Sequence, residues 1–423
     1  MLSAKTIIER QRHLINAELI LAIVIAAVPS RAEESPAASS QYKEWRLPTP
    51  GLADRQSYRR MLRSGEVTDP AVFESVCNWQ LCQITWFEQL LDAPKIREKV
   101  GRDLKLAGKA SSQSAHDRLN TILLRTLSTI AQDESYHQGT RSNAMFLLGR
   151  LSEREPDPVS NDPGEPLRKI LPILLATVES PFKAGPQTND VIRVAALCGL
   201  DRYSRYPFVN EELRQRLLTS LIKLAQQSVP PAGRTPEGHD WLRRRAIEIV
   251  ASAASGNETK TDAQAVSAIR EVLVDRKSAL KVRLTAAAAW AHCGKKDALA
   301  KDQLTPLLRA VVDLASTVID SQLIRGTKGR FDLKQDESRR VLAARLSPLF
   351  AAAQTAAALP NSTPSKGKNS LEKSPATALM DALQFCLRTI GSDEFSDRQV
   401  AQAIREQRES FPSLLASESL ISR

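Results

Sequence analysis

The sequence predicts an all-α protein built from stacked pairs of helices, and three observations indicate this. Hydrophobic residues make up 42% of the 423 residues, whereas aromatic residues make up only 5%. Alanine and leucine therefore supply most of the apolar content, and both favour helices over strands. Leucine-rich and alanine-rich helical patterns alternate along the chain. The chain is too long for one conventional core, so several domains or an array of repeats are expected.

Residues 1–32 have the pattern of an export signal. Three basic residues precede an apolar run at 19–28, and small residues follow around Ala32. The run is shorter than the roughly 20 apolar residues of a membrane span. We therefore expect cleavage after Ala32 and a mature protein in the periplasm or cell envelope of a bacterium. A cytoplasmic chain, or one anchored to a membrane by this segment, is the alternative.

The mature chain would remain basic. Residues 1–32 hold four basic and two acidic residues, so their removal lowers the net charge from +11 to +9.

Two N-terminal regions precede the repeats. Residues 33–68 are polar and contain proline, which predicts a loose arm with at most one short helix at 57–65. Residues 69–112 form the expected N-terminal helical cap. Its first helix should begin after Asp69-Pro70, because aspartate caps helices and proline suits the first turn. Apolar residues then recur every three or four positions and stop before Pro94, which predicts a helix over about 70–92.

Residues 113–359 contain the repeats. Each leucine-rich helix is followed by a second, alanine-rich helix with an arginine near its start, and the five arginines are Arg141, Arg193, Arg243, Arg283 and Arg340. The third position after the arginine is always alanine, at Ala144, Ala196, Ala246, Ala286 and Ala343. The seventh position is apolar in four of the five helices, at Leu148, Leu200, Val250 and Trp290.

The pattern has a physical explanation. An acidic residue stands three positions before the arginine in three helices, at Asp190, Asp240 and Glu337. An acid in the first turn suits the positive end of the helix dipole and can pair with an arginine one turn later. Alanine one turn further on allows a neighbouring helix to approach closely. The second helix is therefore expected to be the inner, tightly stacked member of each pair.

On these residues the chain resembles the HEAT-repeat, or armadillo-type, family of α-solenoids. The resemblance implies an irregular solenoid of about five to seven stacked helical hairpins. The steps between the aligned arginines are 52, 50, 40 and 57 residues, whereas HEAT and armadillo units run about 40–47 residues. We expect long loops such as 154–166 to hold the excess.

The C-terminal region divides into two parts. Residues 360–374 are rich in proline, serine, glycine and lysine, so we expect a flexible linker. Residues 375–423 contain two further helical patterns, which predict a helical cap on the repeats.

No motif predicts a catalytic, cofactor or metal site. The five cysteines have neither paired nor metal-ligand spacing, and Cys77 and Cys82 would lie on different faces of one helix. We expect buried structural thiols. Phosphate-binding loops, nucleophile elbows and histidine metal motifs are missing from the sequence. The sequence therefore favours a protein that is not an enzyme and needs no cofactor.

One cluster is a candidate partner contact, because arginine and tyrosine are enriched at interfaces. It consists of Arg202, Tyr203, Arg205 and Tyr206. The competing interpretation, which we favour, is that the tyrosines wedge two repeats together and the arginines lie at a helix C-terminus.

The resemblance and composition favour a scaffold that binds an unknown protein or peptide. The alternative is a cytoplasmic nucleic-acid-binding protein similar to the HEAT-like DNA glycosylases, because the chain is basic and contains three arginines at 243–245. We favour the scaffold, because acidic residues are interleaved with the basic ones. The surplus charge would also allow weak association with an anionic membrane surface.

Overall fold

The computed structural model describes residues 42–157, 159–160, 162, 164–185, 188–206, 210–254, 260–294, 301–325, 331–333, 338–359, 374–392 and 394–416. Over these residues the protein is 76% helical, which confirms the all-α prediction. The chain divides into two compact units. We call residues 13–220 with 231–234 the first unit, and 221–230 with 235–423 the second. The expected signal peptide, residues 33–41 of the arm, and residues 360–373 of the linker lie outside the described residues.

The described residues of the first unit hold seven complete α-helices and most of an eighth. They are α2 (Leu52–Ser64), α3 (Pro70–Cys82), α4 (Ala93–Gly108), α5 (Ser114–Gln132), α6 (Gln138–Leu148), α7 (Leu171–Glu179), α8 (Asp190–Ser204) and α9 (Glu211–Gln226). Three 3-10 helices are present in the same part, η2 (Gln83–Thr85), η3 (Phe87–Asp92) and η4 (Arg168–Ile170). Strands β1 (Ser152–Arg154) and β2 (Glu165–Pro166) pair antiparallel.

The second unit begins with the end of α9. It continues with α10 (Pro236–Ala254), α11 (Lys260–Val274), α12 (Leu280–Cys293), α13 (Lys301–Gln322), α14 (Ser338–Ala357), α15 (Pro375–Ile390) and α16 (Asp397–Ala416). Strands β3 (Leu323–Arg325) and β4 (Phe331–Leu333) form a hairpin between α13 and α14. The two hairpins lie in the 52-residue and 57-residue steps of the repeat, as expected for 154–166, whereas the described part of the 50-residue step from Arg193 to Arg243 holds no strand.

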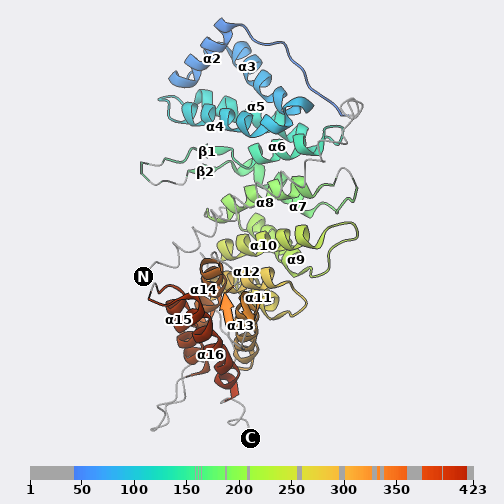
Figure 1. Ribbon diagram of the computed structural model, residues 1–423. Coiled ribbons are helices and arrows are strands. Elements are labelled where there is room, and N and C mark those ends of the chain that lie inside the picture. Colours follow the sequence, from blue (N-terminus) through green and yellow to red (C-terminus); the bar gives the residue numbers. More distant parts are fainter. Residues whose placement is uncertain are drawn as a thin grey trace. The chain divides into compact units, whose positions relative to one another are not determined.

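Neighbouring helices pack in sequence within each unit (Figure 1). In the first unit α5 packs on α6, α7 packs on α8, and α6 and α8 contact each other. In the second unit α11 packs on α12, while α10, α12 and α14 contact one another in turn. The alanine-rich helices thus form the line of contact from one pair to the next, an arrangement compatible with a helical solenoid.

A buried arginine joins the two helices in four of the pairs. In four pairs the repeat arginine donates its Nε–H to the carbonyl of the next-to-last residue of the preceding helix. These bonds run from Arg141 to Ala131 (3.1 Å), Arg193 to Val178 (3.2 Å), Arg243 to Ala225 (2.9 Å) and Arg283 to Leu273 (2.9 Å). The last carbonyls of a helix lack hydrogen-bond donors within the helix and form the negative end of its dipole. A guanidinium supplies both a donor and a positive charge there. We call this contact the arginine clasp.

Burial has an electrostatic consequence for the clasp. Arg193 and Arg243 are 3% and 1% exposed. Desolvation disfavours the charged form, and it lowers the pKa of all four clasp arginines. For Arg193, the acid expected from the sequence offsets this lowering of the pKa, because the Asp190 carboxylate lies 2.6 Å from Nη1 of the arginine. The corresponding pair of Asp240 and Arg243 is longer, at 3.9 Å.

The fifth arginine does not follow the pattern, and the register predicted for that helix is wrong. Arg340 is exposed and Ala343 is only partly buried. Instead Arg339 donates to the carbonyls of Ser392 (3.0 Å) and Phe395 (2.6 Å), which follow α15 rather than end α13. The β3–β4 hairpin separates α13 from α14. Glu337, the acid expected to pair here, lies outside the described residues.

The small residues lie where the inner helices touch. Ala144, Ala196, Ala246 and Ala286 are all 0% exposed. Between α6 and α8 the contact reaches the backbone, since a Cβ atom added to Gly149 would lie 2.7 Å from the Cα of Gly199. No side chain larger than hydrogen fits between the two helices at that point.

Two N-terminal expectations are wrong. The helix expected over 70–92 ends at Cys82, where two 3-10 helices and an extended Trp86 intervene before α4. The arm expected over 33–68 is not loose where it is described, and its expected short helix at 57–65 is present within the longer α2. Helix α2 buries Tyr58, Met61 and Leu62, and the Trp86 indole donates to the Trp45 carbonyl at 3.0 Å.

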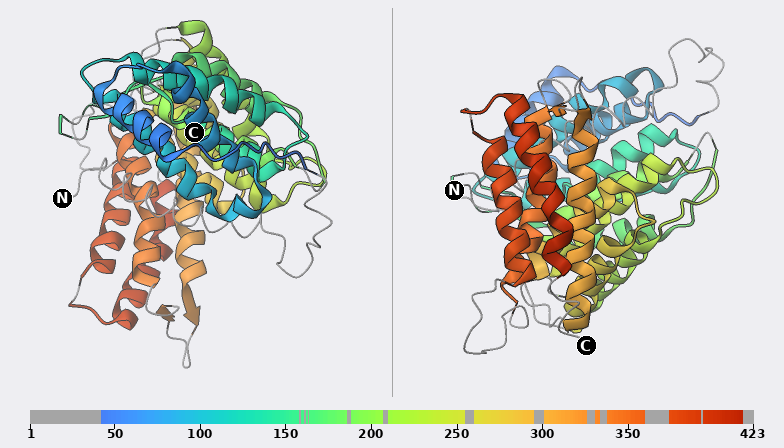
Figure 2. Two further views of the ribbon diagram at one scale, coloured as in Figure 1. Left: turned by 90° about the horizontal axis from the view of Figure 1, so that it is seen from above. Right: turned by 60° about the horizontal axis from the view of Figure 1, so that its bottom comes forward.

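The C-terminal helices close into a bundle. The expected cap pair is present as α15 and α16, but α16 also returns to pack on α13. Figure 2 shows α13 to α16 side by side in orange and red. This return places α16 beside an outer helix of the repeat, which a simple terminal cap would not do.

Replacing Ala286 by leucine should destabilise the second unit. The added side chain has no space where α12 contacts α10 and α14, and overpacking of this kind costs about 1–3 kcal/mol. Urea unfolding measures the effect. Ala344→Leu, at an exposed position, is the control, and equal unfolding midpoints for the two variants would refute the stacking role.

Replacing Arg243 by methionine should remove a clasp. The carbonyl of Ala225 and the hydroxyl of Ser278 both lose a buried donor, which costs about 2 kcal/mol or more. Arg340→Met removes the same charge from an exposed site and should change the unfolding midpoint little. Equal effects of the two substitutions would show that the clasp contributes nothing.

Candidate functional site

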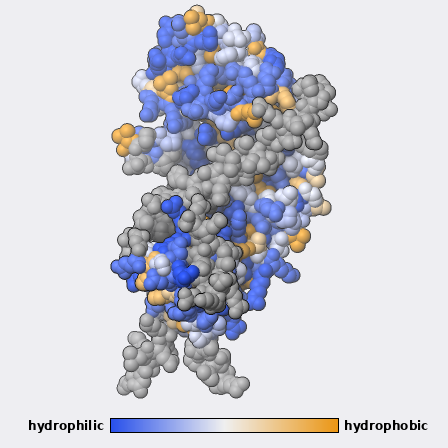
Figure 3. All heavy atoms as spheres, viewed as in Figure 1, coloured by the Kyte–Doolittle hydropathy of each residue, from blue (hydrophilic) through white to orange (hydrophobic). Residues whose placement is uncertain are grey.

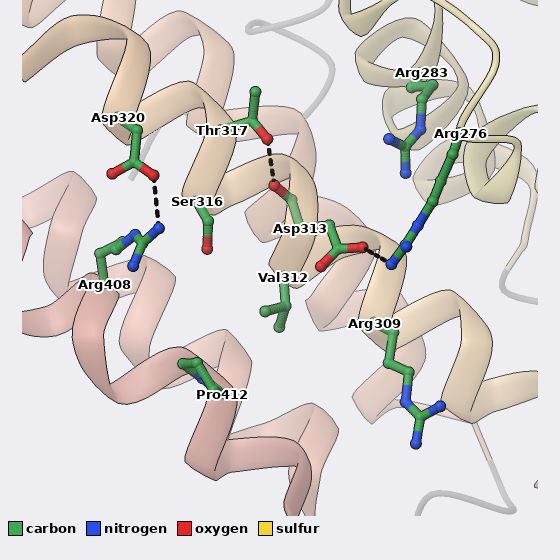
Figure 4. Close-up of a pocket in the computed structure, with 10 residues that line it drawn as sticks. All are labelled: Arg276, Arg283, Arg309, Val312, Asp313, Ser316, Thr317, Asp320, Arg408 and Pro412. Atoms are coloured by element: carbon green, nitrogen blue, oxygen red, sulfur yellow. Dashed lines mark hydrogen bonds and ion pairs between the residues drawn. The ribbon is translucent and has the colours of Figure 1, made fainter.

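A polar groove runs along one face of α13 (Figure 4). Its volume is about 830 Å³. Arg276, before α12, and Arg283, on α12, lie at one end, while Arg408 and Pro412 of α16 lie at the other. The remaining lining residues belong to α13 and are Arg309, Val312, Asp313, Ser316, Thr317 and Asp320.

The α13 residues share a face because they recur every three or four positions. From Arg309 to Asp320 the helix advances roughly 16 Å, at 1.5 Å per residue. The floor of the groove changes in character along this length. It runs from a basic end, through Val312 and Ser316, to the carboxylate of Asp320 (Figure 4).

Both carboxylates of the groove are already paired. Asp313 accepts from Arg276 at 2.5 Å. Asp320 accepts from Arg408 at 2.6 Å and from Arg405 at 3.2 Å. Their negative charges are therefore neutralised by arginines of the same chain.

Two guanidinium groups at the basic end are not fully paired. Arg283 makes its clasp through Nε, but its buried Nη2 has no hydrogen-bond partner in the described structure. Arg309 is exposed and makes no ion pair with another described residue. Desolvation lowers the pKa of Arg283, while the nearby Asp313 opposes this effect. The groove thus offers free donors at its basic end, while at the other end Arg408 keeps a buried Nε without a partner in the described structure.

The cluster predicted from the sequence is engaged mainly within the first unit. Arg202 donates to the carbonyls of Arg150 (2.7 Å) and Leu151 (3.1 Å), just beyond the end of α6. The Tyr203 hydroxyl donates to the Leu167 carbonyl, and burial raises the pKa of this hydroxyl. These contacts agree with the interpretation that the cluster joins two repeats.

The other two members of the cluster are more accessible. Arg205 pairs with Asp201 and remains exposed, while Tyr206 is partly exposed. The structure does not place the cluster in the groove, which lies in the other unit.

Of the groove residues, the sequence pattern points only to Arg283, which occupies a repeat position. Arg309, Asp313 and Asp320 lie on a leucine-rich helix whose main pattern is its apolar face. Their spacing every three or four residues was the available indication. The contribution of α16 had no local indication, because residues about 90 positions apart in sequence meet there.

The thiols are buried, as expected, with one exception. None of the five cysteines forms a disulfide; Cys77, Cys82, Cys293 and Cys386 are buried, while Cys198 is partly exposed. Burial raises the pKa of Cys77, of Cys82 and, to about 12, of Cys386. A protonated thiol is a poor nucleophile and metal ligand.

Two further features are absent from the described residues. No group of three or more histidine, cysteine or acidic residues there could hold a metal ion. Within the same residues, none of the helices has the length and apolar character needed to cross a membrane. On the face shown in Figure 3, described apolar residues are scattered among hydrophilic ones.

Comparison of the chain with models of known protein families and with curated protein sequences finds no match.

Proposed function

We propose that the protein is a non-enzymatic scaffold that binds a protein or peptide, built on a HEAT-like solenoid. The observation that carries the proposal is the groove on α13, an open polar channel lined from three helices and the loop before α12. The HEAT-like assignment rests on the repeated arginine clasp and on the buried alanine one turn after it.

The dimensions of the groove suit an extended peptide. An extended chain rises about 3.3 Å per residue, so the roughly 16 Å of helix face accommodates about five residues. Ser316 supplies a hydroxyl, and Arg309 supplies free donors along the same face. A mixture of charged, hydroxyl and apolar contacts recognises a short segment without requiring a broad apolar surface.

Nucleic acid binding is the second candidate, because the chain is basic and four arginines line the groove. Against it, Asp313 and Asp320 lie on the groove floor. Phosphates along a nucleic acid strand would approach these carboxylates as well as the arginines, which weakens the attraction.

A two-arm binding experiment separates the two functions. Full-length mature protein is screened against a displayed library of random peptides and titrated into labelled duplex DNA at low salt and at about 0.15 M salt. We expect the library to yield enriched peptides. We also expect only weak duplex binding that is lost at the higher salt, because few phosphates are neutralised.

Either of two results would count against the scaffold. One is a library without enriched sequences. The other is submicromolar duplex affinity that persists at the higher salt, which would place nucleic acid binding first.

We also propose that the protein is exported to the periplasm or cell envelope, with weak attraction of its basic surface to anionic membranes. The support is the sequence pattern of residues 1–32. Protein recovered from cells should then begin near Glu33, as determined by N-terminal sequencing. Recovery of an intact Met1 end from the cytoplasmic fraction would favour the alternative location, and recovery from membranes would favour an anchor.

A further inference from the structure

The buried Nη2 of Arg283 distinguishes this arginine from others of the clasp. Arg193 directs its Nη2 to the Ser180 carbonyl, and Arg243 directs its Nη2 to the Ser278 hydroxyl at 2.7 Å. Arg283 is 9% exposed and makes the same clasp through Nε, yet its buried Nη2 has no partner. A buried donor of a charged group left without an acceptor is costly. The site is therefore suited to an acceptor supplied from outside.

The residue three positions before Arg283 also differs from that before Arg193 and Arg243. Arg193 and Arg243 have an aspartate three residues earlier, at Asp190 and Asp240, whereas the same position before Arg283 is Leu280. In Arg193 that aspartate accepts a hydrogen bond from Nη1 at 2.6 Å. Without an acid on its own helix, Arg283 faces the groove with part of its guanidinium unsatisfied.

The charge balance of the groove selects an anion. Four arginines and two aspartates line it, and both aspartates are ion-paired with arginines. An incoming cation finds no free carboxylate, whereas an incoming anion finds the free donors of Arg283 and Arg309. Guanidinium groups bind carboxylates and phosphates through paired hydrogen bonds.

The position of the aspartates favours an isolated carboxylate over a run of charges. Asp313 and Asp320 are seven residues apart on α13, or roughly 10 Å along the helix. Val312 and Ser316 lie on the same face. Further negative charges on the ligand would lie beside these carboxylates, while uncharged residues would contact the apolar and hydroxyl groups.

We propose that the α13 groove binds an acidic peptide segment of a protein partner, with an aspartate or glutamate carboxylate held between Arg283 and Arg309. This deepens the scaffold function and rests on it. Arg276 and Arg408 hold the two groove aspartates in place and keep them from repelling the ligand.

The direct test uses capped nonapeptides, in which acetyl and amide groups remove the terminal charges. One peptide has a central glutamate, the second has glutamine there and the third has phosphoserine. Titration into full-length mature protein should show binding of the glutamate peptide, with at least about fivefold weaker binding of the glutamine peptide. Arg309→Gln should remove most of this difference, while Arg340→Gln, an equal loss of charge at an exposed site away from the groove, should preserve it.

A second variant tests Arg283 without removing its clasp. Leu280→Asp restores the acid found before Arg193 and Arg243, at the first residue of α12, where an acid suits the helix dipole. The new carboxylate should occupy the Arg283 donors and weaken binding of the glutamate peptide about tenfold or more without lowering the urea midpoint. Leu280→Asn, which adds no charge, should leave the affinity within about twofold.

The outcomes distinguish a failure of the groove assignment from a failure of the scaffold function. Equal binding of the glutamate and glutamine peptides, or unchanged binding in Leu280→Asp, overturns the carboxylate site. Preference for the phosphoserine peptide, or displacement of the glutamate peptide by millimolar inorganic phosphate, assigns the donors to phosphate instead. If library peptides bind but are insensitive to both Arg309→Gln and Leu280→Asp, the scaffold function stands and the groove assignment fails. If no library peptide binds either, both fail.

Discussion

A guanidinium buried at the end of a helix is the interaction on which the rest of this structure depends. Two antiparallel helices in a pair need a contact that fixes their relative height as well as their separation. The clasp supplies it, because Arg141, Arg193, Arg243 and Arg283 all reach the carbonyl one residue before the end of the preceding helix. That carbonyl has no partner within its own helix. A shift of either helix by one residue would break this hydrogen bond and leave the buried guanidinium without its acceptor.

The packing between pairs follows from this register. With the arginine fixed, the residue one turn later is directed at the next inner helix, where only a small side chain fits. The four alanines at this position are fully buried, and Gly149 and Gly199 bring two backbones into contact. Where the clasp is missing, at Arg340, the alanine that follows is no longer fully buried.

The sequence predicted those parts of the fold that local chemistry determines. The arginine and alanine positions of α6, α8, α10 and α12 could be read directly, because each repeats the same hydrogen-bonding and packing problem. The break after Cys82 could not, because apolar spacing alone does not distinguish a continuous helix from one interrupted by 3-10 turns. The return of α16 to α13 was also hidden, since it depends on contacts between residues about 90 positions apart.

The groove shows how a structural position can acquire a second role. A clasp arginine uses only its Nε for the helix end, so its remaining donors must be satisfied elsewhere. Asp190 does this for Arg193, and Ser278 does it for Arg243. At Arg283 the residue on the same helix is Leu280, and the bundle of α13 to α16 leaves a groove beside it. The same buried charge that holds the hairpin together then has a donor left for an external acceptor.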